Sequence, residues 1–529
     1  GSSNELKGSD TAEFYQAQSD AVRNDSFNWN TTLNEAMDKT GGNASFVVSA
    51  GDQIQTTKKK SPGKSEMTSE IEYTGYLSPD VLKSLPVATT VGNHDADNAN
   101  YTYHFNTPNS SDLGSNGVVG GDYYFTYGNT LFMMLNTQDT NAAEHKQFME
   151  QAIAANPNCT WRVVTLHQDI YGSAEHSNEP EITNLRYTLV PYFEANDVDV
   201  VLTGHDHAYS RTHILEGGHK TVEYTDDEFD AELDKDMDAG ENPATRYEAP
   251  ANISADSKEP ADVAYLNYLN AVMDKDAVED TEKGETVVNP DGILYMTANS
   301  SSGSKYYDLV PRMQSYIANR WQEDVPTYSV IDVTDNTFTI NTYRTDNDQK
   351  IDETFTIKKG VTEDIKSASV GKVKNQVYTG KQIQPALKVT LNGKTLKAGK
   401  DYTVTYADNK NTGLAKATIN GNGKYTGTQT VTFKIVPEKA VLKTVKVGKS
   451  GIATVTIGKA GGKISGYAIQ VSTDPSFKKV TTYRTAKTTY TLKNLSKGKT
   501  YYVRVKAFTK VSDKNVYGAA SKTIKVKAK

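Results

Sequence analysis

The feature that most constrains the fold is a series of four polar turns, each of which directly follows a short apolar segment. Along the chain the turns read Gly51-Asp52, Gly92-Asn93-His94-Asp95, His167, and Gly204-His205-Asp206-His207. The apolar segments before them span 45–50, 87–91, 162–166 and 198–202, which are lengths typical of buried β-strands. Because parallel strands end at one edge of a sheet, we expect the four turns to meet there.

Longer amphipathic stretches lie between these strands and a further one at 131–135. Helical patterns cover 11–39, where Asn28 is a candidate break, 78–84, 143–155 and 182–196. The alternation predicts an α/β domain, with a central sheet that has helices on both faces and a ligand crevice at its carboxyl edge. Strand patterns at 292–297, 328–333, 337–343 and 353–357 predict the end of this domain, which we place at 1–360.

One segment, about 213–290, breaks the alternation of strands and helices. It contains the acidic runs 226–228 and 234–238, followed by a helical pattern over 261–273. Runs of like charge are usually solvated. We therefore expect an acidic insertion on the surface of the domain.

Past Lys359 the sequence changes to strict apolar–polar alternation with Asn-Gly and Gly-Asn-Gly turns, which predicts two all-β sandwiches at 361–437 and 438–529. The second, with Gly466-Tyr467-Ala-Ile-Gln-Val and the stretch 495–507, resembles a fibronectin type III domain. The first, with Tyr378-Thr-Gly-Lys-Gln-Ile-Gln-Pro and Asp401-Tyr-Thr-Val-Thr-Tyr, is similar to immunoglobulin-like repeats of bacterial surface proteins.

The net charge of −7 hides two halves of opposite sign. Residues 1–360 carry 25 Lys and Arg against 58 Asp and Glu, whereas residues 361–529 carry 33 against 7. The basic half suits a polyanion such as a cell-wall polymer, or the acidic domain itself. Its cations are mostly lysines on strands, so we expect no specific nucleic-acid binding. The longest apolar run, 131–135, predicts no transmembrane segment, and the single cysteine excludes a disulfide scaffold.

The residue types in the four turns point to metal binding. Asp, Asn and His supply the oxygen and nitrogen ligands that Zn, Fe and Mn take, and the glycines let the backbone turn sharply. A lone His-x-His or Gly-Asp is more often an ordinary loop. Four such turns in a fixed order, each at the end of a strand, predict one metal centre.

In this order the turns resemble the signature of the calcineurin-like metallophosphoesterases, over roughly residues 10–355. The last turn, Gly204-His-Asp-His-Ala-Tyr-Ser-Arg211, is similar to that of the purple acid phosphatase branch. The resemblance implies two facing β-sheets flanked by helices and a dinuclear centre at the sheet edge. It also implies hydrolysis of phosphoesters, with phosphomonoesters as the leading substrates and a hydroxide as nucleophile.

The resemblance assigns metal-binding roles to five residues. It implies that Asp52 bridges the two metals, that Asn93, His167 and His205 complete one of them, and that His207 binds the other. The metals are two divalent or trivalent ions, with Fe, Zn, Mn and Mg all open.

Further residues carry roles around the metals. The resemblance places His94 over the phosphate with Asp95 orienting it, and makes His176 a candidate proton donor, although its spacing is one residue short. Gln55 stands where purple acid phosphatases have the tyrosine that colours them, so we expect a colourless protein with Gln55 at or beside a metal. Candidate substrate contacts are Tyr171, Arg211 and Lys305.

Two alternatives to a phosphomonoesterase remain. One is a phosphodiesterase or nucleotidase of the same fold, and the other is a degenerate domain in a surface protein that adheres without hydrolysing. The family's first ligand motif has no counterpart here, so we expect it on a strand upstream of Gly1 and expect activity to need that segment. Sandwiches that follow a catalytic domain are typical of exported bacterial enzymes, which predicts a secreted or cell-surface protein, without a signal peptide in this sequence.

Overall fold

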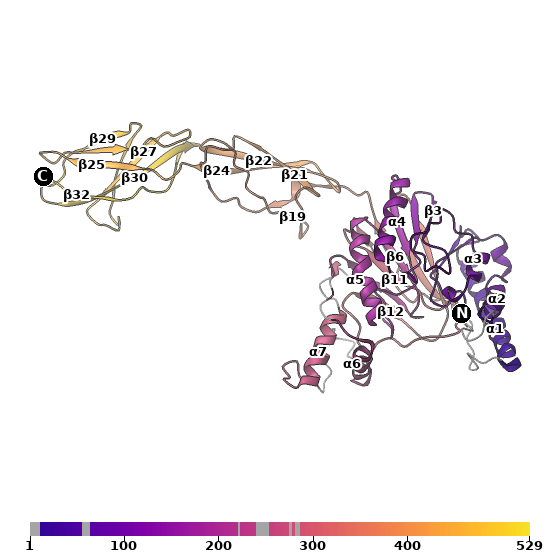
Figure 1. Cartoon of the computed structure of the whole chain (residues 1–529). Helices are drawn as coiled ribbons and strands as arrows, with labels where there is room; N and C mark the ends of the chain where they lie inside the picture. Colours follow the sequence, from indigo (N-terminus) through magenta and orange to yellow (C-terminus); the bar gives the residue numbers. More distant parts are fainter. Residues whose placement is uncertain are drawn as a thin grey trace. The chain divides into compact units, whose positions relative to one another are not determined.

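The structure is a computed structural model, and it describes residues 11–55, 64–218, 220, 223–239, 253–273, 278–280 and 286–529. The chain forms two compact units, 1–359 and 360–529. The first contains helices and sheets, and the second is almost entirely β-strand (Figure 1). Among the described residues, no helix has the length and apolar character needed to cross a membrane.

A seven-stranded sheet forms the centre of the first unit. Its order is β12-β7-β11-β6-β5-β4-β3, in which β4, β5, β6 and β11 run parallel and the outer strands antiparallel. In chain order these strands are β3 (Tyr123–Tyr127), β4 (Thr130–Met134), β5 (Trp161–Thr165), β6 (Val200–Thr203), β7 (Tyr209–Thr212), β11 (Leu294–Thr297) and β12 (Ile317–Trp321). The parallel strands are the apolar segments that the sequence marks.

A second layer of strands faces this sheet. It consists of a four-stranded sheet, β10-β15-β14-β13, and the parallel pair β1-β2. Apolar side chains from both layers, among them Trp161, Met296, Phe338 and Ile357, form one buried cluster. The bounds are β1 (Val47–Ser49), β2 (Val87–Thr89), β10 (Thr286–Val288), β13 (Thr327–Val333), β14 (Thr337–Arg344) and β15 (Phe355–Lys358). The two facing sheets are thus confirmed, and the single central sheet predicted from periodicity is wrong.

Helices cover the outer side of the seven-stranded sheet. Phe148 of α4 (Ala142–Ala155) and Leu189 and Phe193 of α5 (Pro180–Ala195) pack on Leu131 and Met133 of β4 in a second buried cluster (Figure 1). Apolar residues on one side of each helix and one side of the strand make this contact possible.

The helices near the N-terminus differ in part from expectation. α1 (Ala12–Lys39) is unbroken at Asn28, and the side chain of Thr11 caps it by accepting from the Phe14 amide at 3.1 Å. It contacts α2 (Lys64–Tyr76), while the segment predicted as a helix at 78–84 forms only the 3₁₀ turn η1 (Asp80–Lys83). The remaining short elements here are η2 (Asp95–Asp97) and α3 (Asn100–His104).

The acidic insertion carries its own small core. Its described elements are β8 (Ile214–Leu215), α6 (Asp226–Ala239), α7 (Pro260–Met273) and β9 (Val278–Asp280). The acidic run that the sequence assigns to a solvated surface lies in α6, whose Phe229 packs with Tyr265, Tyr268, Leu269 and Val272 of α7. The helix 261–273 is as predicted.

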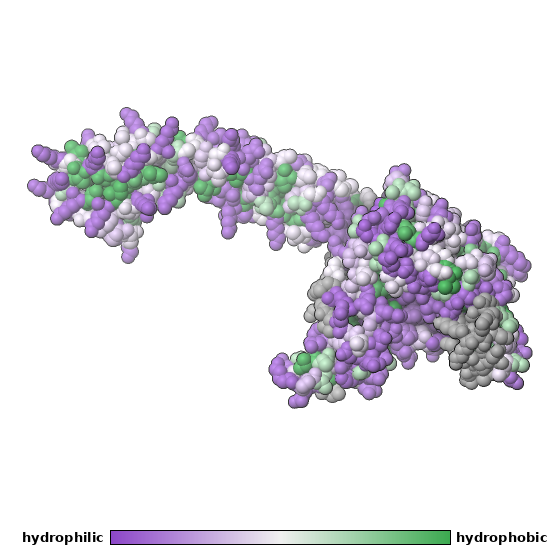
Figure 2. All heavy atoms as spheres, in the orientation of Figure 1, coloured by the Kyte–Doolittle hydropathy of each residue, from purple (hydrophilic) through white to green (hydrophobic). Residues whose placement is uncertain are grey.

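The second unit consists of two sets of strands. Buried clusters around Tyr402 and Phe433 fill the first set, and a separate cluster around Ile469 and Val505 fills the second. Figure 2 shows hydrophilic side chains over much of its visible face, with hydrophobic patches between them. The boundary at 437/438 stays a prediction.

The elements of the first set are β16 (Glu363–Asp364), η4 (Ile365–Ser367), β17 (Ser369–Val370), β18 (Gln376–Val377), β19 (Val389–Leu391), β20 (Lys394–Thr395), β21 (Tyr402–Ala407), β22 (Gly413–Gly421), β23 (Tyr425–Thr426) and β24 (Thr428–Val436). Those of the second set are β25 (Leu442–Val447), β26 (Ala453–Ile457), β27 (Gly466–Ser472), β28 (Thr481–Thr485), β29 (Thr489–Leu492), β30 (Thr500–Val511), β31 (Lys514–Tyr517) and β32 (Ile524–Lys527).

Candidate metal centre

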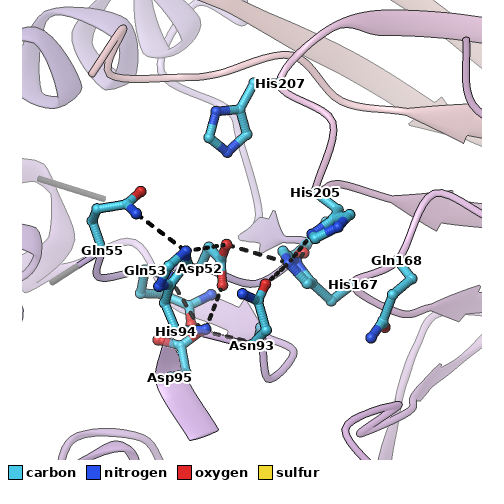
Figure 3. A network of polar contacts seen from close by, with 12 residues as sticks. Asp52, Gln53, Gln55, Asn93, His94, Asp95, His167, Gln168, His205 and His207 are labelled. Atoms are coloured by element: carbon cyan, nitrogen blue, oxygen red, sulfur yellow. Dashed lines mark hydrogen bonds and ion pairs between the residues drawn. The ribbon is translucent and has the colours of Figure 1, made fainter. Parts of the chain in front are cut away.

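The four polar turns meet at the carboxyl edges of β1, β2, β5 and β6. Asp52 follows β1, Asn93 follows β2, His167 follows β5, and His205 and His207 follow β6. The parallel pairing of β1 with β2 and of β5 with β6 places each pair of turns at one edge. The side chains of the turns converge in Figure 3, as the order of the motifs predicts.

The glycines of these turns are needed because neighbouring ligand groups approach their Cα atoms. A Cβ added at Gly92 would lie 2.1 Å from Oδ1 of Asp52, and one at Gly51 would lie 2.4 Å from Nδ1 of His167. Asp52, His205 and His207 themselves have φ of +48°, +70° and +47°. Non-glycine residues in this region carry backbone strain, which persists mainly at functional sites.

The closest group of ligand atoms belongs to Asp52, His167 and His205, and all of these atoms lie within 4.8 Å of one another. Nε2 of His167 is at its centre, 3.3 Å from Oδ2 of Asp52 and 3.1 Å from Nδ1 of His205. Oδ1 of Asn93 lies 3.0 Å from the same nitrogen. Figure 3 shows these four side chains directed at a common point.

The hydrogen bonds around this group fit a bound cation. Nδ1 of His167 donates to the carbonyl oxygen of Ala50 at 2.8 Å, so in the neutral ring Nε2 presents its lone pair to the oxygens of Asp52 and Asn93. Lone pairs that converge in this way repel one another unless a positive charge lies among them. A backbone carbonyl that fixes the tautomer of a histidine is also typical of metal sites.

Electrostatics favour an ionised Asp52 and a neutral His205. Burial lowers the pKa of His167, but the charge of Asp52 outweighs it and raises that pKa above its ordinary value. Burial raises the pKa of the Asp52 carboxyl, but the imidazoles of His167 and His94 outweigh it and hold that pKa far below its ordinary value. Burial, together with the neighbouring His167, lowers the pKa of His205 to about 3. An ionised carboxylate beside a neutral imidazole is what a metal ion requires.

His207 lies apart from this group, and its ring points toward it (Figure 3). Its Nδ1 donates to the carbonyl oxygen of Lys305 at 2.9 Å, which directs Nε2 to the other side of the ring. Burial lowers the pKa of His207 to about 4, so the ring is neutral near pH 7. His207 can therefore act as a ligand at a second position.

His94 and Gln55 contact each other beside Asp52. The backbone N–H of His94 donates to Oδ1 of Asp52 at 3.0 Å, and its Nε2 lies 3.9 Å from Oδ2. The side-chain amide of Gln55 lies 3.1 Å from the same Nε2 and donates to it. Gln55 thus lies beside His94, where it sets the direction of the ring.

Asp95 supports the turn that carries Asn93 and His94. Its buried carboxylate accepts from the Tyr73 hydroxyl at 2.9 Å and from the Gly92 N–H at 2.9 Å. Burial and the charge of Asp52 raise the pKa of Asp95 to about 7. It therefore positions His94 through the backbone.

His176 lies beside the group of ligands despite its shortened spacing. Its ring centroid is 5.3 Å from that of His205, and its Nδ1 lies 2.5 Å from Oε1 of Glu179. Burial lowers the pKa of His176, but Glu179 and Asp206 outweigh it and raise the pKa above its ordinary value.

Sequence reasoning gave no individual role to two residues near His176. Asp206, buried inside the last turn, accepts from the His176 N–H at 3.0 Å and from the Ala174 N–H at 2.9 Å. Its place between two histidines was the available signal. Tyr307, whose ring lies 4.5 Å from that of His176, belongs to no motif.

Two of the three predicted substrate contacts are in the core instead. Tyr171 is 1% exposed, and Arg186 lies over its ring at 4.5 Å. Arg211 is held by Asp352 through bonds of 2.6 and 3.1 Å, and it lies between the two layers of strands, over Phe355. The structure does not support either as a substrate contact. Lys305 is half-buried and adjoins His207 through its carbonyl.

Comparison with known proteins relates the chain to one enzyme family and one β-sandwich family. Residues 24–209 match the family model described as calcineurin-like phosphoesterase, and residues 442–523 match fibronectin type III domain. Two uncharacterized proteins of Mycobacterium tuberculosis, one from each of two strains, are 26% identical in an alignment of 156 residues that covers 25% of this chain. The match spans 29% of the length of those relatives.

Two solved structures are similar to parts of the chain. A purple acid phosphatase from yellow lupin seeds has a TM-score of 0.41 at 13% identity, covering 63% of this chain and 49% of that one. The sixth fibronectin type III domain of the human fibronectin type III domain containing protein 3 has a TM-score of 0.15 at 21% identity, covering 17% of this chain and 85% of that one. The chain therefore contains a calcineurin-like phosphoesterase domain over residues 24–209, in which the four turns converge, and a fibronectin type III domain over residues 442–523.

Proposed function

We propose that this protein hydrolyses phosphomonoesters at a dinuclear metal centre. The observation that carries the proposal is the convergence of acceptor atoms from Asp52, Asn93, His167 and His205 on one point. In this assignment Asn93, His167 and His205 would hold one ion, His207 would hold the other, and Asp52 would serve both. Fe, Zn, Mn and Mg are all compatible with these oxygen and nitrogen donors.

When bound, two such ions would supply positive charge for the phosphate and for its leaving oxygen, and would lower the pKa of the attacking water. The chain's own residues do the rest. His94, whose ring lies beside Asp52 and Gln55, stabilises the charge that develops on the phosphoryl oxygens.

Proton donation to the leaving group falls to His176 in this account. Glu179 binds its Nδ1, so the proton for the leaving oxygen is held at Nε2. The backbone of His176 is fixed by Asp206, and its ring is packed against that of Tyr307. These contacts restrain the donor before the substrate arrives.

An extracellular location and contact with polyanions are part of the same proposal. Their support is the fibronectin type III domain and the charge of residues 361–529, where 33 Lys and Arg face 7 Asp and Glu. Such contact must weaken as salt rises. Retention on a polyphosphate-bearing matrix that did not change with salt would contradict it.

A pair of chromogenic esters, one phosphomonoester and its diester analogue, tests the proposed reaction. We expect the metal-loaded protein to hydrolyse the monoester faster, and His207→Ala to lower that rate at least about 100-fold because one metal position is lost. His104→Ala, which replaces a histidine bonded to Glu70 outside the site, is the matched control. Preference for the diester would place the protein in another reaction class, and no turnover of either ester by protein that holds two metals would contradict hydrolysis.

A further inference from the structure

The loop 303–309 faces the proposed metal centre, and no motif accounts for it. We propose that Tyr307, together with Lys305, contacts the phosphoryl group of the substrate and favours the dianion of a monoester over the single charge of a diester. This inference rests on the proposed function, and it adds a residue that discriminates between substrate classes.

Tyr307 lies between two histidines with different proposed roles. Its ring centroid is 4.5 Å from that of His176 and 5.0 Å from that of His207. The same histidine His176 adjoins His205, 5.3 Å between centroids. The phenol therefore lies between His176, the proposed proton donor, and His207, the proposed second metal ligand. Its side chain is only half-buried.

Lys305 supplies a positive charge beside Tyr307. Its ammonium lies over the ring of Tyr307, 4.2 Å from the centroid, and donates a hydrogen bond to the phenolic oxygen. Because the oxygen accepts from Lys305, its own O–H proton is left to donate elsewhere. Across the described part of the chain, no carboxylate is paired with this ammonium, so its charge is available to an anion.

The loop is tied at both ends to segments that carry the histidines. The carbonyl of Lys305 accepts from Nδ1 of His207 at 2.9 Å. Farther along, the N–H of Val310 donates to the carbonyl of Ser173 at 3.1 Å, and Leu309 forms a β-bridge with Ala174, in the segment that leads to His176. The phenol and both histidines are thus held as one arrangement, which reduces the cost of ordering them around a ligand.

The charge of the substrate determines whether Lys305 and Tyr307 favour a phosphomonoester or a diester. A phosphomonoester carries up to two negative charges near neutral pH, and a diester carries one. Attraction between an ammonium and an anion grows in proportion to the charge of the anion. A hydrogen bond from a phenol to a charged oxygen is also stronger than one to a neutral acceptor. Both contributions are larger for the monoester.

Binding of inorganic phosphate to the Zn²⁺-loaded full chain, measured by isothermal titration calorimetry, tests Tyr307 without relying on turnover. We expect Tyr307→Phe to raise the Kd about tenfold, because one hydrogen bond to a charged group is lost. Tyr306→Phe is the matched control, since it removes the same atom from the adjacent ring. The Tyr306 hydroxyl lies instead at Gly303, where an added Cβ would be 2.7 Å from it.

Lys305→Met tests the discrimination, because its backbone bond to His207 is retained. We expect kcat/KM for the monoester to fall about tenfold through KM, and that for the diester to fall much less. Lys350→Met, at an exposed lysine, should leave both unchanged.

The outcomes separate this inference from the proposed function. Equal phosphate binding by Tyr307→Phe and Tyr306→Phe, or an unchanged ratio of monoester to diester in Lys305→Met, overturns the inference and leaves the function standing. Metal-loaded wild-type protein that neither binds phosphate nor turns over either ester overturns both.

Discussion

The side chain of Asp206 accepts hydrogen bonds from a loop other than the one that contains it. It stands between two proposed ligands, yet its carboxylate is fully buried and accepts from the N–H groups of Ala174 and His176 and from the Ser177 hydroxyl at 2.5 Å. The last of the four polar turns and the loop of the proposed proton donor are therefore joined by one side chain.

Replacing this side chain should destabilise the first unit. Asp206→Ala removes the acceptor of the His176 N–H, while the Ala174 N–H and the Ser177 hydroxyl keep second acceptors in Ser177 and Asp169, so we expect a cost of about 1–3 kcal/mol. Chemical denaturation should show this loss, and Asp230→Ala, at an exposed position of α6, should change the free energy of unfolding by less than about 0.5 kcal/mol. A stability equal to that of the control would show that the bonds to Asp206 contribute little.

For single residues, the sequence predicts the type of ligand better than it predicts the direction of a side chain. Asp52, His167 and His205 could be predicted because their chemistry and strand-terminal position agree. Arg211 could not be placed, because the alternation of a strand directs it between the sheets to Asp352. Tyr307 reaches the site only through a fold that brings a distant loop beside β6.

Helices and strands likewise divide into those that the sequence predicts and those that it does not. The strands β4, β5 and β6 were predictable because continuous apolar runs are typical of strands buried on both faces. The two-layer arrangement was not evident from periodicity, since a strand buried between a sheet and helices has the same pattern as one in a central sheet. The acidic helix α6 was missed because its charges conceal Phe229, which packs on α7.

A buried ion pair links Asp122, which directly precedes β3, to His145 of α4. This pair makes the stability of the fold depend on pH. Nδ1 of His145 lies 2.7 Å from Oδ2 of Asp122, and its Nε2 lies 2.8 Å from the Asp139 carbonyl, so both ring nitrogens face acceptors. Burial lowers the pKa of His145, but Asp122 outweighs it and raises that pKa; burial also raises the pKa of Asp122. The folded pair therefore binds a proton more tightly than the unfolded chain does.

The sign of the dependence follows from the raised pKa of His145. Its contribution is fully present below the ordinary histidine pKa of about 6.5 and is lost as pH rises through the folded pKa. The raised pKa of Asp122 acts in the same direction, at lower pH. As pH rises above about 6.5, we expect the free energy of unfolding to fall more in wild type than in His145→Gln. Parallel curves for the two proteins would contradict this.

The whole molecule combines two units of opposite charge. Residues 1–360 carry 58 Asp and Glu against 25 Lys and Arg, and the basic excess lies entirely in the second unit. The proposed chemistry belongs to the first unit alone, because every ligand and proton donor named above lies before Lys359. The second unit contributes surface and charge, and its composition made both its β character and its separation predictable.

The central claim is that the strand-terminal turns form a two-metal site. Metal content per chain, measured by inductively coupled plasma mass spectrometry after reconstitution and gel filtration, tests it most directly. We predict about two ions per wild-type chain and fewer than one in Asp52→Asn, because the residue assigned between both ions is changed. Wild-type protein without stoichiometric metal, or an Asp52→Asn variant with the same metal content as wild type, would contradict the account.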